Sequence, residues 1–541
     1  MSKIKFLISG LFVFFNAFII VLGQNVTLTT TNLPLVIINT NGLAINSNSK
    51  IKAQMKIIFN TDSKANHPTD SPNIYTGNIG IEEHGSSSLS YPQKSYSLET
   101  RDDLGNNLNV PILDMPSDND WLLIQHYNDN TLMKNALSFN LFEKMGHYQP
   151  RVRYCEVILN NVYAGVYILT EKIKQGKNRV DIANLKLTDN AGDSLTGGYI
   201  FKIDNSSGSD GWSSTYDAID RPGSFPYFIY NYPKVSDITS QQQKYLQAFI
   251  ASFDKELRND DFADPIHGYR AYADVNSFMD YFIVGEVSRN VDAYKKSAYF
   301  NKNKDSNGGL IHAGPVWDFD WAWKNMSECI VDNTDGSGWS YQISSVCHSN
   351  PVPPGWVSKF LEDPTFADAL KTRYVDLRKT LLSEESLYSF IDSIQNLLKD
   401  AKMRHYRKWE VDGVSTSSTD IDVNNNYTLE IHNFEDWIST REAWLDDNMP
   451  GNYITVNTKI KKYNFTYILF PNPAIDKFYV ESTFCIKKLE LYNNTGMLVK
   501  SKLVNNLYST EMELTDISSG LYFAKIEFND GHRESVKLLV H

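Results

Sequence analysis

The sequence predicts an α+β protein of several domains that ends in a small β-sandwich. A chain of 541 residues is too long for one hydrophobic core and suggests about three domains. Strand-like runs fill the N-terminal part, helical patterns cover 237–289 and 355–450, and from residue 463 short strands recur between turn signals. Strands and helices that are segregated in this way are typical of α+β folds.

Residues 1–23 have the pattern of a secretory signal peptide. Two lysines supply a positive start, residues 6–22 are almost wholly apolar, and small Gly23 precedes polar Gln24. That order is typical of a leader that is cleaved after translocation. The alternative is a membrane anchor, for which an apolar run of about 17 residues is at the short limit of spanning length.

The composition excludes two broad classes of protein. A net charge of −12 argues against nucleic acid or an anionic membrane as the main partner. Charged residues make up 21% and aromatic residues 13% of the chain, which is not a disordered composition.

Cys329 and Cys347 flank a polar loop and are candidates for a disulfide in an oxidising compartment, a pairing that spacing alone leaves open.

The N-terminal elements are predicted from β-branched runs and turn residues. Residues 24–65 are expected to form β structure, and 77–102 two strands around a Gly/Ser-rich turn. Helical spacing over 131–146 ends at a glycine, a natural stop signal. Residues 153–173 are predicted to form a β-hairpin.

The later elements follow the same reasoning. Residues 197–204 are predicted to be a strand, 237–258 and 273–289 helices, 297–321 a strand, turn and strand, and 355–450 mostly helical with a polar break at 414–426. The composition shifts again near Asn452. Regularly spaced strands over 463–541 predict a separate small β-sandwich.

Two carboxylates, Asp318 and Asp320, stand in the otherwise apolar and aromatic run GPVWDFDWAW. In an extended chain, residues two apart share one face. Buried paired carboxylates need a partner, and a divalent cation is a natural one. The alternative is a loop in which the two acids cap a turn.

Asp292 follows a predicted helix and precedes the strand whose partner carries the acid pair. Asp292 and Asp318 therefore stand at the two ends of one strand-turn-strand unit. In that arrangement one carboxylate would act as a base and the other would hold a metal ion. An ordinary helix-terminal aspartate is the alternative interpretation.

Lys94 alternates with Tyr91 and Tyr96 on a predicted strand that follows the Gly/Ser-rich turn. A lysine in this place is able to reach phosphate groups, although a surface lysine is the simpler interpretation. The chain contains no Walker motif, no G-x-G-x-x-G, no G-x-S-x-G, no H-E-x-x-H and no CxxC.

Five blocks of the sequence resemble the family of spore-coat protein H (CotH), an atypical protein kinase. They are EEHGSSSLSYPQKSYSLETR, DWLLIQHYNDNTLMKNALSFNLFEKMG, VILNNVYAGVYILTEKI, GGYIFKID and GPVWDFD, in the family's order. The resemblance covers roughly 75–450. It implies a two-lobed, kinase-like fold that binds ATP with Mg²⁺ or Mn²⁺ and phosphorylates Ser/Thr of secreted or coat proteins.

The resemblance also implies roles for individual residues. Asp292 falls on the catalytic-loop aspartate, and Asp318 on the metal-binding aspartate. Lys94 matches the lysine of the family's KKSY block and becomes the candidate phosphate ligand. Glu171, in LTEK, falls near the adenine side.

The chain departs from the family pattern at Ser297. The family places an asparagine there, five residues after the catalytic aspartate, and in kinases that asparagine holds a second metal ion. Serine offers a neutral oxygen at shorter reach. Asp320 is a candidate to compensate, since relatives also carry an acid at this position.

The C-terminal blocks FPNPAIDKFYV, LYNNTGMLVKS, LTDISSGLYFAKI and SVKLLVH resemble the sorting domain of the type IX secretion system of Bacteroidetes. The resemblance implies passage through the periplasm, contact with the secretion machinery, removal of this domain, and release or surface attachment. The expected organisation is thus a leader at 1–23, a β segment at 24–65, a kinase-like domain at 66–450 and a sorting domain at 463–541.

Two functions remain open on the sequence. The first is a secreted or surface kinase that acts on a protein acceptor. The second is a catalytically inactive surface adhesion or binding module that keeps the fold. Nucleotide binding in the presence of a divalent metal separates them.

Overall fold

The computed structural model describes residues 26–61, 64–325, 335–343, 351–409, 427–453, 467–493, 495–528 and 533–541. The predicted leader, the proposed Cys329–Cys347 pair and the polar stretch 414–426 lie outside these residues. The chain divides into two compact units, Met1–Ile454 and Thr455–His541. Within the described ranges, none of the helices has the length and apolar character needed to cross a lipid bilayer.

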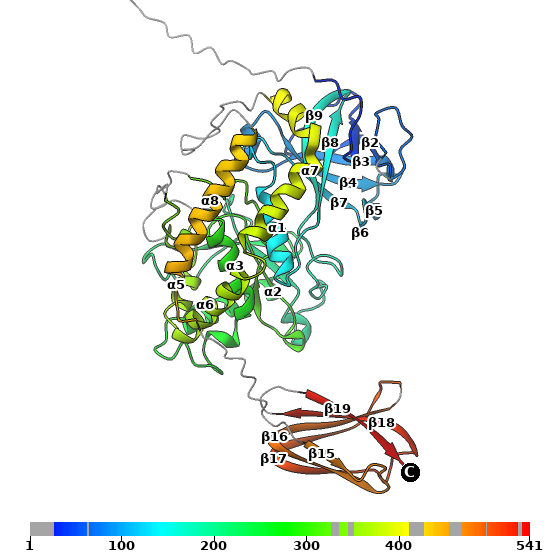
Figure 1. The fold of residues 1–541 in the computed structure, drawn as a ribbon, viewed down its shortest axis with the longest axis vertical. Coiled ribbons are helices and arrows are strands. Elements are labelled where there is room, and N and C mark those ends of the chain that lie inside the picture. The colour runs from blue at the N-terminus through cyan, green and yellow to red at the C-terminus, as the bar shows by residue number, and fades with distance from the viewer. Residues whose placement is uncertain are drawn as a thin grey trace, which may run out of the picture. The chain divides into compact units, whose positions relative to one another are not determined.

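The larger unit begins with strands that close into a barrel in the order β1-β2-β3-β4-β7-β9-β8 (Figure 1). Neighbouring strands run antiparallel, except that β8 closes on β1 in parallel. The bounds are β1 Leu35–Asn39, β2 Ile51–Ile58, β3 Tyr75–His84, β4 Ser95–Arg101, β7 Asp120–Ile124, β8 Val152–Leu159 and β9 Val162–Glu171. The short strands β5 (Val110–Ile112) and β6 (Met115–Asp118) pair with each other beside it.

The barrel interior is a packed apolar core. On β3, Ile79 and Ile81 are fully buried in a cluster with Leu98 of β4 and other alternating residues. Because successive side chains of a strand point to opposite faces, Glu82 and His84, at even positions further along β3, lie on the outer face of the barrel. The segment 24–65 does not stand apart, since β1 and β2 are barrel strands.

Local sequence signals account for the connections. The predicted hairpin over 153–173 forms as β8 and β9, and its two turn residues, Asn160 and Asn161, have φ of 51° and 64°. Positive φ at both central positions is the turn geometry that matches the twist of paired strands. Helix α1 (Lys134–Lys144) lies between β7 and β8 and stops before Gly146, whose φ is 104°. The predicted helix and both predicted hairpins of this region are confirmed.

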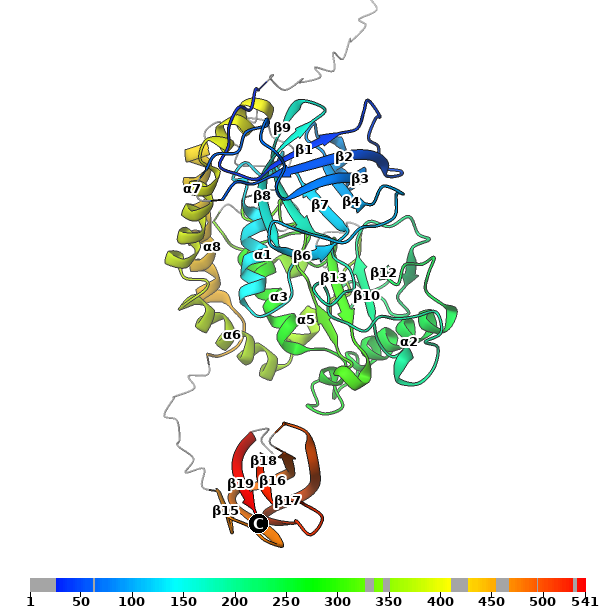
Figure 2. The same cartoon turned by 90° about the vertical axis from the view of Figure 1, so that its right-hand side faces the viewer.

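The rest of the larger unit combines a second sheet with helices. The sheet has the order β11-β12-β10-β13-β14. Its strands are β10 Tyr199–Ile203, β11 Gly211–Ser213, β12 Tyr227–Tyr232, β13 Ala298–Lys302 and β14 Ile311–Ala313. The helices are α2 Ser240–Glu256, α3 Val275–Val287, α5 Trp356–Phe360, α6 Pro364–Arg378, α7 Glu384–Trp409 and α8 Tyr427–Asn448. Figures 1 and 2 show α7 and α8 side by side along the unit, with α2, α3, α5 and α6 away from the barrel.

Two connections tie the helices to the barrel. The largest apolar core runs from α1 through α3 to the C-terminal helices and includes residues of β9, such as Val166 and Ile168. Helix α7 also bonds β9 directly, because the Val166 N–H donates to His405 Nδ1 at 3.1 Å and Trp409 Nε1 donates to the Ala164 carbonyl at 3.1 Å. The unit is therefore the mixed α+β structure that the sequence predicts.

A buried ion pair between Glu286 and Arg441 joins α3 to α8. Arg441 Nη2 lies 3.2 Å from Glu286 Oε2, and both side chains are 0% exposed. Arg441 also donates to the carbonyls of Gly336 and Gly338, at 2.7 Å each. The Tyr294 hydroxyl donates to Glu286 Oε1 at 3.1 Å. The Glu286–Arg441 pair therefore holds Tyr294, Gly336 and Gly338, which follow α3 in the chain, in place through hydrogen bonds.

The C-terminal unit is one connected sheet with its own core. Its strands are β15 Tyr467–Phe470, β16 Lys477–Asn493, β17 Leu498–Glu513, β18 Gly520–Phe528 and β19 Arg533–Val540. The long strand β16 pairs with β15, β17 and β18 through register shifts along its length. The strands of the predicted β-sandwich are hydrogen-bonded into one five-stranded sheet, in which the first part of β16 pairs with β15 and its second part with β18.

We expect Arg441→Met to destabilise the larger unit by about 3–5 kcal/mol, because it leaves the Glu286 carboxylate buried and uncompensated. Urea unfolding followed by tryptophan fluorescence measures the loss. The matched control is Lys379→Met, which removes an exposed cation from a surface pair with Asp376 and should leave the midpoint unchanged. Equal midpoints for wild type and Arg441→Met would contradict the prediction.

Candidate functional site

The segment 314–323, which carries both predicted metal ligands, is anchored to α1. The Phe319 N–H donates to Asn135 Oδ1 at 2.7 Å, and Trp323 Nε1 donates to Ser138 Oγ at 2.8 Å. Asn135 and Ser138 are buried residues of α1. These contacts hold the backbone on one side of Asp318 in a fixed position.

Asp318 and Ser297 meet through a hydrogen bond. Ser297 Oγ donates to Asp318 Oδ2 at 3.3 Å, although 20 residues separate the two in the chain. Both residues have left-handed backbones, with φ of 50° at Ser297 and 66° at Asp318. Residues other than glycine seldom adopt a left-handed backbone, and backbone strain of this kind clusters at functional sites.

Carboxylates gather around Asp318. Asp318 is exposed to solvent, although many protein atoms lie near its carboxyl group. Burial raises the pKa of Asp318 well above its usual value, repulsion from Asp320, Asp204 and Asp292 adds to the rise, and the Ser297 hydroxyl opposes it. Three carboxylates therefore act on Asp318 here, one from its own segment and two from other loops.

Asp292 lies in the loop that follows α3. Its backbone N–H donates to Asn290 Oδ1 at 3.0 Å. Its Oδ1 lies 3.4 Å from Lys295 Nζ and 3.3 Å from Lys296 Nζ. The Tyr281 hydroxyl donates to the carbonyl of the next residue, Ala293. The loop is thus held from α3, and two lysines offset the charge of its aspartate.

The prediction that Asp318 and Asp320 share one face of an extended strand is wrong. The segment is not a strand, and the backbone of Asp318 is left-handed. Asp320 is buried, 6% exposed, and burial raises its pKa. Its Oδ1 atom accepts no hydrogen bond from the part of the chain that the structure describes. Asp320 still lies close enough to raise the pKa of Asp318.

Asp204 is a member of the cluster that sequence reasoning missed. It directly follows β10, and Lys202 Nζ contacts its Oδ2 at 2.6 Å. Strand β10 pairs with β13 so that Ile203 is opposite Ala298, the neighbour of Ser297. The sequence did show an aspartate at the end of a predicted strand. The pairing of that strand with β13, which brings Asp204 into the cluster, was not predictable from the local sequence pattern.

Lys94 and Glu171 lie elsewhere in the described structure. Lys94 directly precedes β4, and its ammonium donates to the Leu89 carbonyl in the preceding turn. Glu171 ends β9 and is fully buried, where it accepts from Arg151 Nη1 at 2.7 Å and pairs with Arg179. None of these contacts joins either residue to the carboxylates around Asp318.

The carboxylates around Asp318 would supply only some of the ligands that a divalent cation needs. Across the described ranges, no three His, Cys, Asp or Glu side chains gather closely enough to hold a metal ion. Mg²⁺ in phosphoryl-transfer sites is usually bound by one or two carboxylates together with substrate phosphates. Asp318 is exposed to solvent, and Asp320 has one oxygen that accepts no hydrogen bond from the described residues. Both are therefore suited to supply the carboxylate ligands of such a site.

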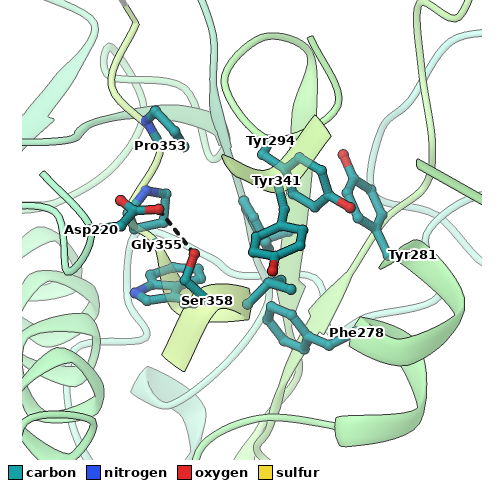
Figure 3. A pocket seen from close by; sticks show the side chains of 12 residues that line it. Asp220, Phe278, Tyr281, Tyr294, Tyr341, Pro353, Gly355 and Ser358 are labelled. Atoms are coloured by element: carbon teal, nitrogen blue, oxygen red, sulfur yellow. Dashed lines mark hydrogen bonds between the residues drawn. The ribbon is translucent and has the colours of Figure 1, made fainter. Parts of the chain in front are cut away.

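Figure 3 shows an aromatic pocket to which the loop after α3 contributes Tyr294. Tyr281 and Tyr294 line it together with Tyr341 and Phe278, while Ser358 and Asp220, joined by a hydrogen bond of 2.9 Å, lie across from them. The predicted site residues do not line it. Tyr294, two residues after Asp292, connects this pocket to the loop.

Two family models match the chain. The model described as CotH kinase protein matches residues 81–445, and the model described as secretion system C-terminal sorting domain matches residues 468–541. No curated protein matches the chain. The sorting domain indicates export by the type IX machinery to the medium or the cell surface. Since the first match spans most of the sequence, this chain belongs to the CotH kinase protein family and carries a secretion sorting domain at its end.

Proposed function

We propose that this protein is an exported kinase that transfers the γ-phosphoryl group of ATP to Ser or Thr of a secreted or surface protein. One observation carries the proposal. Asp292, Ser297 and Asp318, which the family resemblance assigns to one reaction centre, are neighbours: Ser297 Oγ is 3.3 Å from Asp318, and Asp292 raises the pKa of Asp318.

The carboxylates have separate roles in this proposal. Asp318, supported by Asp320, would hold Mg²⁺ or Mn²⁺, which neutralises phosphate charge when bound. Asp292 accepts the proton of the acceptor hydroxyl. The hydroxyl oxygen then bonds to the γ-phosphorus, while the bond to the bridging oxygen breaks and ADP leaves. Lys295 and Lys296 orient the Asp292 carboxylate through their contacts.

The proposed contacts with the nucleotide are those that the family resemblance implies. Lys94 is proposed to contact phosphate, for which its ammonium must exchange the Leu89 carbonyl for a phosphate oxygen. Glu171 is proposed to lie near adenine. Because two arginines already engage its carboxylate, its part is to fix the end of β9 rather than to bond the base.

The second candidate function is a binding module without transfer activity. Ser297 favours it, because a serine hydroxyl stands where the family has asparagine and is already bonded to Asp318. Calorimetry of the full chain with ATP and Mg²⁺ or Mn²⁺ decides between the two. Nucleotide binding supports the kinase, whereas no binding with either metal defeats it and leaves the binding module.

Asp292→Asn and Asp318→Asn should separate transfer from binding. Asp292→Asn keeps size but loses the base, so nucleotide binding should survive while the transfer rate falls about 100-fold or more. Asp318→Asn removes a charged metal ligand, so binding of the metal–nucleotide complex should weaken. Asp320→Asn should resemble Asp318→Asn if it also holds metal, and wild type if it only supports the loop.

Autophosphorylation with labelled ATP, beside a binding isotherm for each variant, measures both quantities. The matched control is Asp260→Asn, which neutralises an exposed acid elsewhere and should change neither. Loss of nucleotide binding in Asp292→Asn, or full transfer in Asp318→Asn, would contradict the assigned roles.

Ser297→Asn should raise activity or tighten the metal dependence, because the longer amide restores the oxygen that kinases use for a second metal. Asparagine also tolerates the left-handed backbone at this position. Ser297→Ala, which removes the oxygen, is the opposite control. Identical Mg²⁺ and Mn²⁺ titrations for wild type and Ser297→Asn would sink the idea.

Deletion of 463–541 should leave the larger unit folded but hold it in the periplasm. The reason is that the two units have separate cores, whereas the sorting signal lies in the smaller one. Fractionation with a protease-protection assay locates the truncated protein, and circular dichroism checks its fold. Truncated protein in the medium or on the surface at the full-length level would refute this prediction.

A further inference from the structure

Gln149, in the loop between α1 and β8, bonds the backbone of the segment that carries Asp318. Its Nε2 donates to the Val316 carbonyl at 2.6 Å, and the Val316 N–H donates to its Oε1 at 3.0 Å. A carboxamide suits this task because it carries a donor and an acceptor side by side. Gln149 is 3% exposed, so water has little access to these two bonds.

Val316 needs such a partner because the neighbouring sheet does not supply one. Strand β14 ends at Ala313, and no strand of the described ranges pairs with Val316. Val316 is fully buried, and buried backbone N–H and C=O groups without a partner are costly. The bonds from Gln149 therefore replace the ladder bonds of a strand and fix the chain two residues before Asp318.

Asp318 is thus restrained from both sides. Gln149 fixes Val316 before it, and Asn135 accepts from the N–H of the next residue, Phe319, at 2.7 Å. The φ of Asp318 is 66°, a conformation that an aspartate keeps only when its surroundings impose it. The two amide side chains are placed to impose it, because they hold the chain on either side of this one residue.

The loop of Gln149 is itself firmly held. His147 Nε2 lies 2.8 Å from Asp280 Oδ2 on α3. The Tyr148 hydroxyl donates to Glu171 Oε2, at the end of β9, at 3.3 Å. Because different elements hold the two residues directly before Gln149, this glutamine is a fixed point for the segment that it bonds. Outer contacts of this kind orient metal ligands in proteins.

We infer that Gln149 is a positioning residue for the metal ligand Asp318. Its two bonds to Val316 keep the Asp318 carboxylate where it binds a divalent cation, beside Ser297. The inference rests on the proposed function, in which Asp318 holds Mg²⁺ or Mn²⁺, and it adds the residue that orients this ligand. Gln149 itself touches neither metal nor nucleotide. Without its bonds the chain around Asp318 relaxes, and the carboxylate leaves its place.

Gln149→Met tests the inference, because methionine fills a similar volume and forms neither bond to Val316. Electron paramagnetic resonance of free Mn²⁺ measures binding to the full chain, with Mn²⁺ alone and with Mn²⁺ and ATP. The variant should bind Mn²⁺ about ten-fold or more weakly than wild type, the scale for loss of a contact that orients a metal ligand. Without metal, amide hydrogen exchange of peptides that cover 314–323 should be faster in the variant.

Gln242→Met is the matched control. Gln242 is similarly buried, 1% exposed, and its amide donates to the Lys186 carbonyl in another loop at 2.7 Å. The same substitution there should lower thermal stability, but it should leave Mn²⁺ binding of the folded protein and hydrogen exchange of 314–323 unchanged. The comparison separates a general loss of stability from a loss of positioning.

A double-variant cycle shows whether Gln149 acts through Asp318. In the Asp318→Asn background, Gln149→Met should cause little further loss of Mn²⁺ affinity, because the two substitutions remove one and the same effect. For phosphoryl transfer, Gln149→Met should raise the Mn²⁺ concentration that gives half of the maximal rate. The rate at saturating Mn²⁺ should change less, since the base Asp292 is untouched.

Several results would overturn the inference: no Mn²⁺ binding by wild type in either condition, equal affinities of wild type and Gln149→Met, equal losses in Gln149→Met and Gln242→Met, or full additivity with Asp318→Asn. Failure of the kinase proposal looks different. Absence of phosphoryl transfer, with Mn²⁺ binding that depends on Gln149, would defeat the kinase and leave the positioning role in place.

Discussion

Repulsion among the carboxylates around Asp318 is the constraint on which the site depends. Asp204, Asp292 and Asp320 all make ionisation of Asp318 harder, so the fold must supply opposing charge or leave the cluster protonated. It supplies that charge locally, with Lys202 on Asp204 and with Lys295 and Lys296 on Asp292. Within the described residues Asp318 itself receives only the Ser297 hydroxyl, which leaves it as the member with most to gain from a cation.

This crowding is maintained by contacts that lie outside the cluster. Segment 314–323 is fixed to α1, and the Asp292 loop is fixed to α3 through Tyr281 and through Tyr294 on Glu286. The Glu286–Arg441 pair extends that support to α8. Since like charges would otherwise move apart, a rigid frame is a physical requirement for holding them within reach of one ligand.

Local patterns predicted the elements of this fold, and long-range pairings explain what was missed. Alternating apolar residues and turn signals were sufficient for the β3–β4 and β8–β9 hairpins and for α1. The pairing of β10 with β13, which brings Asp204 beside Ser297, depends on segments about a hundred residues apart and has no local signature. The expected shared face of Asp318 and Asp320 failed because a positive φ at Asp318 breaks the two-residue period.

The parallel pairing of β1 with β8 has a consequence for the order in which an exported chain acquires its structure. Leu35 of β1 pairs with Glu156 of β8, so β1, which comes first in the chain among the barrel strands, waits for one of the last of them. During that interval β1 and β2 form a hairpin with an open edge, which is a template for pairing with other chains. Slow delivery of residues 130–160 would therefore prolong the period of aggregation risk, which ends when the barrel closes.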